Sequence, residues 1–312
     1  MSRVCRICLK GLRDHGDYHV RCLRALFGTA KVPQLDVNLS KLHTAALAMV
    51  GHTSLSGVQK KISVNLSTDR ETLQVAAEGG RYILKPQTEA FPSLPENEHV
   101  TTCLAKLVEI EVPPCGMVAL SDGSPAFISR RFDRLPDGRK LRQEDFCQLA
   151  EQSPKDKYEG SAELCVRLVR RYATEPIIEI LKLYRLMVFA WWSGNGDMHL
   201  KNFSLLTDSQ GITRMTPAYD LVSTQLVIPN DPLALPVVGK KSNLTRNTWL
   251  EFGEYCRIPK KTAVRALEKQ ASVAIAANAL IDVCLLPGDQ KSALKALLAD
   301  RTASLLGHAQ LG

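Results

Sequence analysis

Short segments in the first half of the chain alternate between apolar and polar residues, which is the pattern of half-buried β-strands. They cover residues 61–66, 72–76, 81–85, 117–120 and 126–130. Glycine- and aspartate-containing turns separate them. After Pro95 the apolar positions return every three or four residues as far as Val108, which predicts one helix within this strand-rich half.

Beyond residue 140 the pattern is mostly that of helices. Thr174 and Pro176 predict a helix start, with the threonine as cap and the proline in the first turn. The apolar pattern continues from there to Trp192 and ends at Gly194. Further on, a hairpin over residues 203–206 and 212–215 and two helices, over about 262–286 and 289–306, are predicted.

This order of elements predicts an α+β protein with two lobes, a β-rich N-lobe and a helical C-lobe. A cleft between two lobes is a common place for a ligand. The 312 residues, 45% of them hydrophobic, are enough to bury a large core.

Composition indicates where the protein resides and which partners its charge permits. No apolar run approaches the ~20 residues that span a bilayer, and the first residues have no apolar signal region, so we expect no membrane association. Nine cysteines, mostly scattered through apolar pattern, fit free thiols in a reducing cytoplasm. The net charge of +8 is spread over dispersed basic pairs and does not by itself choose between nucleic acid, an acidic protein and a phosphorylated ligand.

The strongest chemical signal lies just after the helix that ends at Gly194. Asp197 and Asn202 are five positions apart, the spacing of the kinase catalytic loop. Asp220 follows the next hairpin, where kinases place a second metal-binding aspartate. Each aspartate alone could equally cap or begin a turn. Together they predict a base at Asp197 and magnesium ligands at Asn202 and Asp220.

The first half supplies matching parts. Lys85 ends a predicted strand, as a lysine that binds ATP phosphates should. Glu98 lies near the start of the following helix and could pair with Lys85, or could simply be a favourable charge at a helix N-terminus. The small polar segment 53–61 could fold over phosphates, although it has a single glycine and no Walker pattern.

In combination, these residues resemble the HipA-type serine/threonine kinases, which are toxins of bacterial toxin–antitoxin systems. The resemblance covers roughly residues 24–250. It rests on segments 54–60 (Ser-Leu-Ser-Gly-Val-Gln-Lys), 82–86 (Tyr-Ile-Leu-Lys-Pro), 94–98 (Leu-Pro-Glu-Asn-Glu), 129–134 (Ser-Arg-Arg-Phe-Asp-Arg), 142–145 (Arg-Gln-Glu-Asp), 196–202 (Gly-Asp-Met-His-Leu-Lys-Asn) and 218–221 (Ala-Tyr-Asp-Leu). Within the family it looks most similar to HipT, the short toxin of three-component systems, which shares Leu-Phe-Gly-Thr-Ala-Lys at 26–31 and a Ser-x-Ser loop.

The resemblance implies roles for individual residues. The loop with Ser56, Gly57 and Gln59 would cover ATP, and Phe132 would end the adenine hinge. His199 would lie near the nucleotide. Ser54 and Ser56 would be sites of self-phosphorylation that switch the kinase off, because a phosphoserine beside nucleotide phosphates is repelled. The bland alternative is that both serines only satisfy backbone groups in a turn.

The resemblance also implies partners. Members of this family phosphorylate aminoacyl-tRNA synthetases and are neutralised by a DNA-binding antitoxin. About 50 residues precede the ATP loop, too few for the N-terminal subdomain of the full-sized toxins. We therefore expect a small HipS-like protein and a DNA-binding HipB-like protein as partners, with DNA contacted only indirectly.

Near the N-terminus, Cys5, Cys8, His19 and Cys22 provide a different set of candidate ligands. Zinc prefers tetrahedral sulfur and nitrogen ligands, and a pair two residues apart can chelate from a tight turn. His15 is a competing ligand, and unrelated buried thiols are the alternative. We expect a structural zinc knuckle in residues 1–40, followed by the N-lobe with its ATP-covering loop at 41–135 and the C-lobe with the catalytic loop at 136–312.

Two other functions compete with a protein kinase. A small-molecule phosphotransferase of the antibiotic- or choline-kinase type shares the Asp-to-Asn spacing but lacks the Ser-x-Ser-Gly-x-Gln loop and the Arg-Phe-Asp-Arg segment. An inactive kinase-fold regulatory module is disfavoured because Lys85, Asp197, Asn202 and Asp220 are all present.

Overall fold

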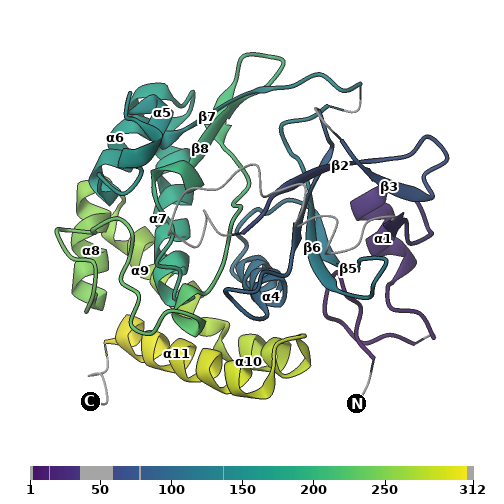
Figure 1. The fold of residues 1–312 in the computed structure, drawn as a ribbon. Coiled ribbons are helices and arrows are strands. Elements are labelled where there is room, and N and C mark those ends of the chain that lie inside the picture. The colour runs from purple at the N-terminus through teal and green to yellow at the C-terminus, as the bar shows by residue number, and fades with distance from the viewer. Residues whose placement is uncertain (1–2, 14, 36–58, 77–78, 136, 308–312) are drawn as a thin grey trace.

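A computed structural model of the protein describes residues 3–13, 15–35, 59–76, 79–135 and 137–307. The strand-rich part and the helical part lie side by side (Figure 1). The mixed fold with two lobes predicted from the sequence is confirmed. Among the described helices, none is long and apolar enough to cross a membrane.

A six-stranded sheet forms the first lobe, with strand order β1-β3-β2-β4-β6-β5. Its strands are β1 (Gln34–Leu35), β2 (Ile62–Leu66), β3 (Thr72–Val75), β4 (Tyr82–Pro86), β5 (Cys115–Ala119) and β6 (Pro125–Arg130). The short β1 pairs parallel to β3, and the other pairs are antiparallel. The alternating segments of the sequence are therefore strands of one sheet, in which β2–β3 and β5–β6 are hairpins.

The alternation along β4 decides which side chains face the helical lobe. Tyr82 and Leu84 pack with helix α1 (Val20–Phe27) in one apolar cluster. Ile83 and Lys85, one position out of phase, line the cleft on the opposite face. Because successive side chains of a strand point to opposite faces, Lys85 is brought to the cleft while its neighbour Leu84 is buried against α1.

Helix α4 (Leu94–Leu107) lies between the sheet and the helical lobe (Figure 1). Pro95 sits in its first turn, so the helix begins one residue before the proline rather than after it. Val100, Cys103 and Leu104 join the large core of the helical lobe. α4 thus belongs to both lobes, and its position determines how they meet.

The second lobe is built around α7 (Pro176–Trp192), most of whose residues are buried. The other α-helices described there are α5 (Phe146–Leu149), α6 (Ala162–Tyr172), α8 (Arg246–Tyr255), α9 (Lys260–Ser272), α10 (Ala274–Val283) and α11 (Gly288–Leu306). Trp192 at the end of α7 donates a hydrogen bond to Thr302 of α11 (3.0 Å), which holds the end of α7 in place.

A three-stranded sheet, in the order β7-β8-β9, frames the loop after α7. Its strands are β7 (Arg142–Asp145), β8 (Ser204–Thr207) and β9 (Thr213–Met215). The hairpin β8–β9 is the one predicted. β7 pairs with β8 across about sixty residues of sequence, which no local pattern could indicate.

Two local predictions were wrong. The single helix expected over 262–286 is two helices, because Val273 leaves helical geometry (φ −87°, ψ 2°). This bend lets α9 pack on α7 and α8 while α10 packs on α4. Thr174 does not cap α7 either: Glu175 is the N-cap residue, and the Thr174 hydroxyl accepts a hydrogen bond from the backbone N–H of Thr213 (2.9 Å).

Candidate active site

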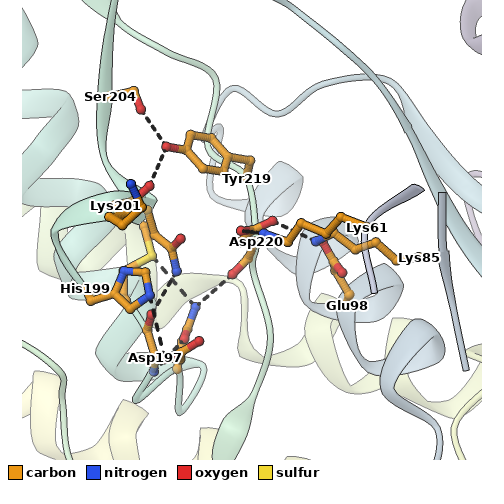
Figure 2. Close-up of polar contacts among 12 residues, drawn as sticks. Lys61, Lys85, Glu98, Asp197, His199, Lys201, Ser204, Tyr219 and Asp220 are labelled. Carbon is orange, nitrogen blue, oxygen red and sulfur yellow. Dashed lines mark hydrogen bonds and ion pairs between the residues drawn. The ribbon is translucent and has the colours of Figure 1, made fainter. Parts of the chain in front are cut away.

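An ion cluster joins the two lobes in the cleft. The Lys85 ammonium, from the end of β4, pairs with Glu98 of α4 and with Oδ1 of Asp220 (2.7 Å). The Lys61 ammonium pairs with the other oxygen of Asp220 (2.5 Å). Figure 2 shows Asp220 facing these two lysines from the segment that follows the β8–β9 hairpin. The predicted pairing of Lys85 with Glu98 is therefore present.

Opposite charges within the cluster shift the pKa values of Asp220 and Lys85. Burial disfavours an ionised carboxyl, but the ammonium groups of Lys61 and Lys85 outweigh it and hold the pKa of Asp220 well below its ordinary value. Burial also opposes the charge of Lys85, yet the carboxylates of Asp220 and Glu98 keep the pKa of Lys85 above its ordinary value. Near pH 7 the Asp220 carboxylate is therefore ionised and can bind cations, and the Lys85 ammonium is positively charged.

The loop after α7 brings Asp197 and Asn202 together. The Asn202 side-chain amide donates to the Asp197 carbonyl (2.8 Å), and the backbone N–H groups of His199 and Asn202 close tight turns on the carbonyls of Asp197 and His199 (both 2.9 Å). Because the side-chain nitrogen of Asn202 donates this hydrogen bond, the side-chain oxygen is the atom that can bind a metal ion. The spacing of five seen in the sequence is therefore a compact turn.

Asn195, which the sequence analysis did not single out, ties this loop to Asp220. Its side-chain oxygen accepts from the Asp197 backbone N–H (3.1 Å), and its nitrogen donates to the Asp220 carbonyl (3.5 Å). Behind the loop, the backbone N–H of Gly196 donates to the Thr224 hydroxyl (2.8 Å), which in turn donates to Asp231. The two aspartates predicted for catalysis are therefore positioned by one hydrogen-bonded network.

Two further side chains surround Asp197. The Tyr158 hydroxyl donates to Oδ1 of Asp197 (2.5 Å), and the His199 ring lies edge-on to Tyr158 (5.1 Å between ring centroids). Burial raises the pKa of Asp197, and the Tyr158 hydrogen bond opposes that rise only in part. Burial, with the nearby charge of Lys157, lowers the pKa of His199 to about 3, so its imidazole is neutral near pH 7.

A partly open pocket of about 150 Å³ lies beside the ion cluster. Lys85, Glu98 and Asp220 line its polar end, and Phe127, Phe132 and Tyr219 contribute its aromatic surface. The Phe132 and Tyr219 rings lie 5.8 Å apart. Tyr219 is anchored by its hydroxyl, which donates to the Lys201 carbonyl (2.9 Å) and shares a hydrogen bond with Ser204 (2.6 Å) (Figure 2). A pocket with aromatic lining next to fixed cations suits a nucleotide.

Most of the predicted site residues meet here. Gln59 is buried three residues before β2 and two before Lys61. Ser54, Ser56 and Gly57 lie outside the described residues. Tyr158 was not predicted from the sequence. Lys61 was predicted only as the last residue of the segment 53–61 and as a member of a basic pair, without a role of its own.

Comparisons with known proteins give the family of the chain. A sequence profile of the HipA-like C-terminal domain matches residues 53–278. The candidate kinase Y4mE of Sinorhizobium fredii is 35% identical over 64% of this chain, and the matched part is half of that protein. A candidate kinase of Haemophilus influenzae is 27% identical over 80% of this chain and 79% of its own length.

Solved structures show the same fold. HipA from a Shewanella oneidensis complex of HipA, HipB and operator DNA superposes with a TM-score of 0.73 at 20% identity, over 89% of this chain and 73% of that one. The Helicobacter pylori proinflammatory kinase CtkA gives a TM-score of 0.53 at 17% identity, over 72% and 88%. The chain therefore belongs to the HipA-like C-terminal domain family and has its kinase-like fold.

Proposed function

We propose that this protein transfers the γ-phosphoryl group of ATP to a serine or threonine hydroxyl of another protein. The observation that carries the proposal is the ion cluster, in which Asp220 contacts Lys61 and the Lys85–Glu98 pair. Asn195 connects Asp220 to the loop that contains Asp197 and Asn202. A lysine on a strand, a glutamate on the adjacent helix and an aspartate after the catalytic loop are the parts that kinases use.

The donor set fits the groups that this chemistry needs. Asp220 and Asn202 offer oxygen ligands, which Mg²⁺ prefers, and Lys85 offers a fixed charge for phosphate. Bound magnesium neutralises charge on the phosphates. Lys61 holds one Asp220 oxygen, so a metal ion bound by Asp220 would compete with the Lys61 ammonium for this carboxylate. Ser56, Gly57 and Gln59 would cover the nucleotide, with Phe132 and His199 beside it.

Asp197 is the proposed base. Its partly buried carboxylate has a raised pKa, which makes it a better proton acceptor than an exposed aspartate. The Tyr158 hydroxyl holds one oxygen, leaving the other to orient the attacking hydroxyl and take its proton. The neutral His199 imidazole packs against Tyr158 and keeps this side of the loop rigid.

The direct test is transfer of labelled γ-phosphate by purified protein with magnesium and ATP. Asp197→Asn preserves shape but removes the base, so we expect a fall of roughly 10²–10⁴-fold in the transfer rate with ATP affinity nearly unchanged. Normal turnover of the variant would exclude this role for Asp197.

The substrate proposed is an aminoacyl-tRNA synthetase or another translation protein. Phosphoproteomes of cells with wild-type protein and with Asp197→Asn should differ at serine or threonine sites of such a protein. A phosphorylated small molecule as the only product would instead support the antibiotic- or choline-kinase alternative. Failure to consume ATP at all would favour an inactive regulatory module.

Ser54 and Ser56 are proposed sites of self-phosphorylation. Phosphate in the ATP-covering loop adds about −1.5 to −2 charge, which the nucleotide phosphates repel and nearby lysines attract. Wild type incubated with magnesium and ATP should carry phosphate within residues 53–61. Aspartate variants at these positions should be less active than alanine variants, and equal activity would exclude the switch.

We also propose that the protein acts as a cytoplasmic toxin of a toxin–antitoxin system. The structural likeness to HipA, which was solved with HipB and operator DNA, supports a DNA-binding antitoxin as partner. The likeness in sequence to HipT supports a second, HipS-like small protein. DNA would be contacted through the HipB-like partner and not directly.

A further inference from the structure

Cys5, Cys8, His19 and Cys22 form a cluster at the start of the chain, outside the cleft. Each offers one ligand atom, and the four atoms lie within 4.8 Å of one another. Zn–S bonds of about 2.3 Å at tetrahedral angles separate ligand sulfurs by about 3.8 Å, so the groups need to close only slightly around an ion. Three sulfurs and one imidazole nitrogen are a Cys₃His set typical of structural zinc sites.

His19 is oriented as a ligand. Its Nε2 lies 3.1 Å from the Gly11 carbonyl, a contact that requires the proton on Nε2. The other ring nitrogen, Nδ1, faces Sγ of Cys8 (3.4 Å) and of Cys22 (3.9 Å). The backbone N–H of His19 donates to Sγ of Cys5 (3.3 Å). In metal sites, the ring nitrogen of a histidine that does not bind the metal usually donates a hydrogen bond to a carbonyl or carboxylate, as Nε2 of His19 does here.

We propose that these four residues bind one Zn²⁺ ion, and that the metal-bound segment braces helix α4 so that Glu98 stays paired with Lys85. We call the described residues between Cys5 and Cys22 the knuckle. Metal binding and the order of α4 are independent of the function proposed above. The effect on phosphoryl transfer rests on that function.

The knuckle contacts α4 through Ile7, which lies between two of the ligands. The Ile7 carbonyl accepts a hydrogen bond from Nε2 of His99 (3.1 Å), and Sγ of Cys103 one turn later approaches the same oxygen (3.9 Å). His99 and Cys103 are both buried. A buried histidine that loses this acceptor leaves a polar group without its partner, so α4 is sensitive to where the knuckle lies.

The knuckle also pairs with the edge strand β5. The Met117 backbone N–H donates to the Arg6 carbonyl (2.8 Å), and the Tyr18 hydroxyl donates to the Met117 carbonyl (2.9 Å). Gly116 permits this close approach, because a Cβ there would lie 2.6 Å from the Ile7 side chain. The knuckle therefore contacts both the sheet, through β5, and helix α4.

Three consecutive residues of α4 bind three different parts of the protein. Asn97 exchanges two hydrogen bonds with the Ser223 backbone in the helical lobe (2.9 and 2.8 Å). Glu98 pairs with Lys85 of the sheet, and His99 reaches the knuckle. Because these residues are adjacent on one rigid helix, a shift at His99 moves Glu98. Kinases depend on this lysine–glutamate pair being in place.

Metal content tests the site. Full-length wild type, purified without chelators or added metal, should contain about one zinc per chain. Cys5→Ser/Cys8→Ser should contain almost none, and Cys147→Ser, which changes a buried cysteine outside the cluster, should keep it. If the double variant does not fold, wild type stripped by a chelator and titrated with Co²⁺ should show thiolate-to-cobalt absorption. Zinc-free wild type without this absorption overturns the site.

Hydrogen exchange tests the brace. Removing zinc from wild type should speed amide exchange in α4 severalfold, with α7 unchanged, and adding zinc back should restore protection. His99→Leu should keep its zinc but show the same faster exchange in α4 and slower phosphoryl transfer. Unchanged exchange in α4 after zinc removal overturns the brace. If wild type shows no transfer, the proposed function fails while the zinc and exchange results still decide this inference.

Discussion

Lys85 is the residue on which the charges of the cleft depend. Its side chain is 4% exposed and is shared between Glu98, 2% exposed, and Asp220. Removing one member of a buried ion pair leaves the other uncompensated, which costs more than the pair contributes while intact. The site therefore tolerates loss of Lys85 worse than simultaneous loss of Lys85 and its partner.

Lys85→Met should lower the free energy of unfolding by about 3–5 kcal/mol, because Glu98 is left buried without its cation. Lys85→Met/Glu98→Gln should recover part of that loss, although both variants should be inactive. Urea unfolding of the two variants beside wild type measures this. A double variant less stable than the single one would show that the charge of Glu98 is not the cause.

The pH dependence of transfer should report Asp197. A base must be ionised, so the rate should fall as the pH drops through the pKa of Asp197, which burial raises above the ordinary aspartate value of about 3.9. His199, with its pKa lowered to about 3, should add no step near neutrality. The profile of kcat/KM measures both. A step near pH 6.5 that disappears in His199→Asn would contradict this assignment.

At the scale of elements, the loop after α7 packs closely against the segment that contains Asp231 and Pro232. Gly196 lies against Asp231 and Pro232, and an added Cβ would come within 2.1 Å of the Asp231 carboxylate and 2.6 Å of the Pro232 carbonyl. The loop that carries Asp197 thus has its position set by close packing as well as by hydrogen bonds.

Gly196→Ala should therefore push the loop out of place. We expect a loss of about 1–3 kcal/mol in unfolding free energy, as for other overpacked sites, together with slower phosphoryl transfer. Gly288→Ala is the matched control, because nothing lies within 4 Å of a Cβ at the first residue of α11. Equal stability and rate in both variants would show that the loop adjusts without cost.

At the scale of the whole molecule, the cleft depends on how the two lobes meet. α4 and the ion cluster contribute to this junction, through the hydrogen bonds of Asn97 with Ser223 and the Lys85–Asp220 pair.

We expect the protein to be purified from its native cell in a complex. Tagged protein should recover a small DNA-binding protein with a helix-turn-helix and a second small protein, whereas a tagged basic protein of similar size should recover neither. This expectation rests on the partners proposed above, a DNA-binding HipB-like protein and a small HipS-like protein. A stable lone monomer, obtained with neighbouring reading frames intact, would contradict the partner proposal.

The sequence by itself determined the elements and the local chemistry. Strand alternation, the helix of α4 and the five-residue spacing of Asp197 and Asn202 are properties of neighbouring residues, so they can be read along the chain. The same holds for the pairs of ligands in the N-terminal knuckle. The resemblance in motifs then gave the family, which the sequence profile confirms.

Only the tertiary structure decided which distant groups meet. Lys61 reaches Asp220 across 159 positions and Tyr158 reaches Asp197 across 39, and no local pattern indicates either pairing. The contact between His99 and Ile7 spans 92 positions and depends on how the knuckle folds against α4. The break at Val273 likewise arises because α9 and α10 pack on different helices. Periodicity records which face of an element is apolar, whereas topology decides what that face and its neighbours touch.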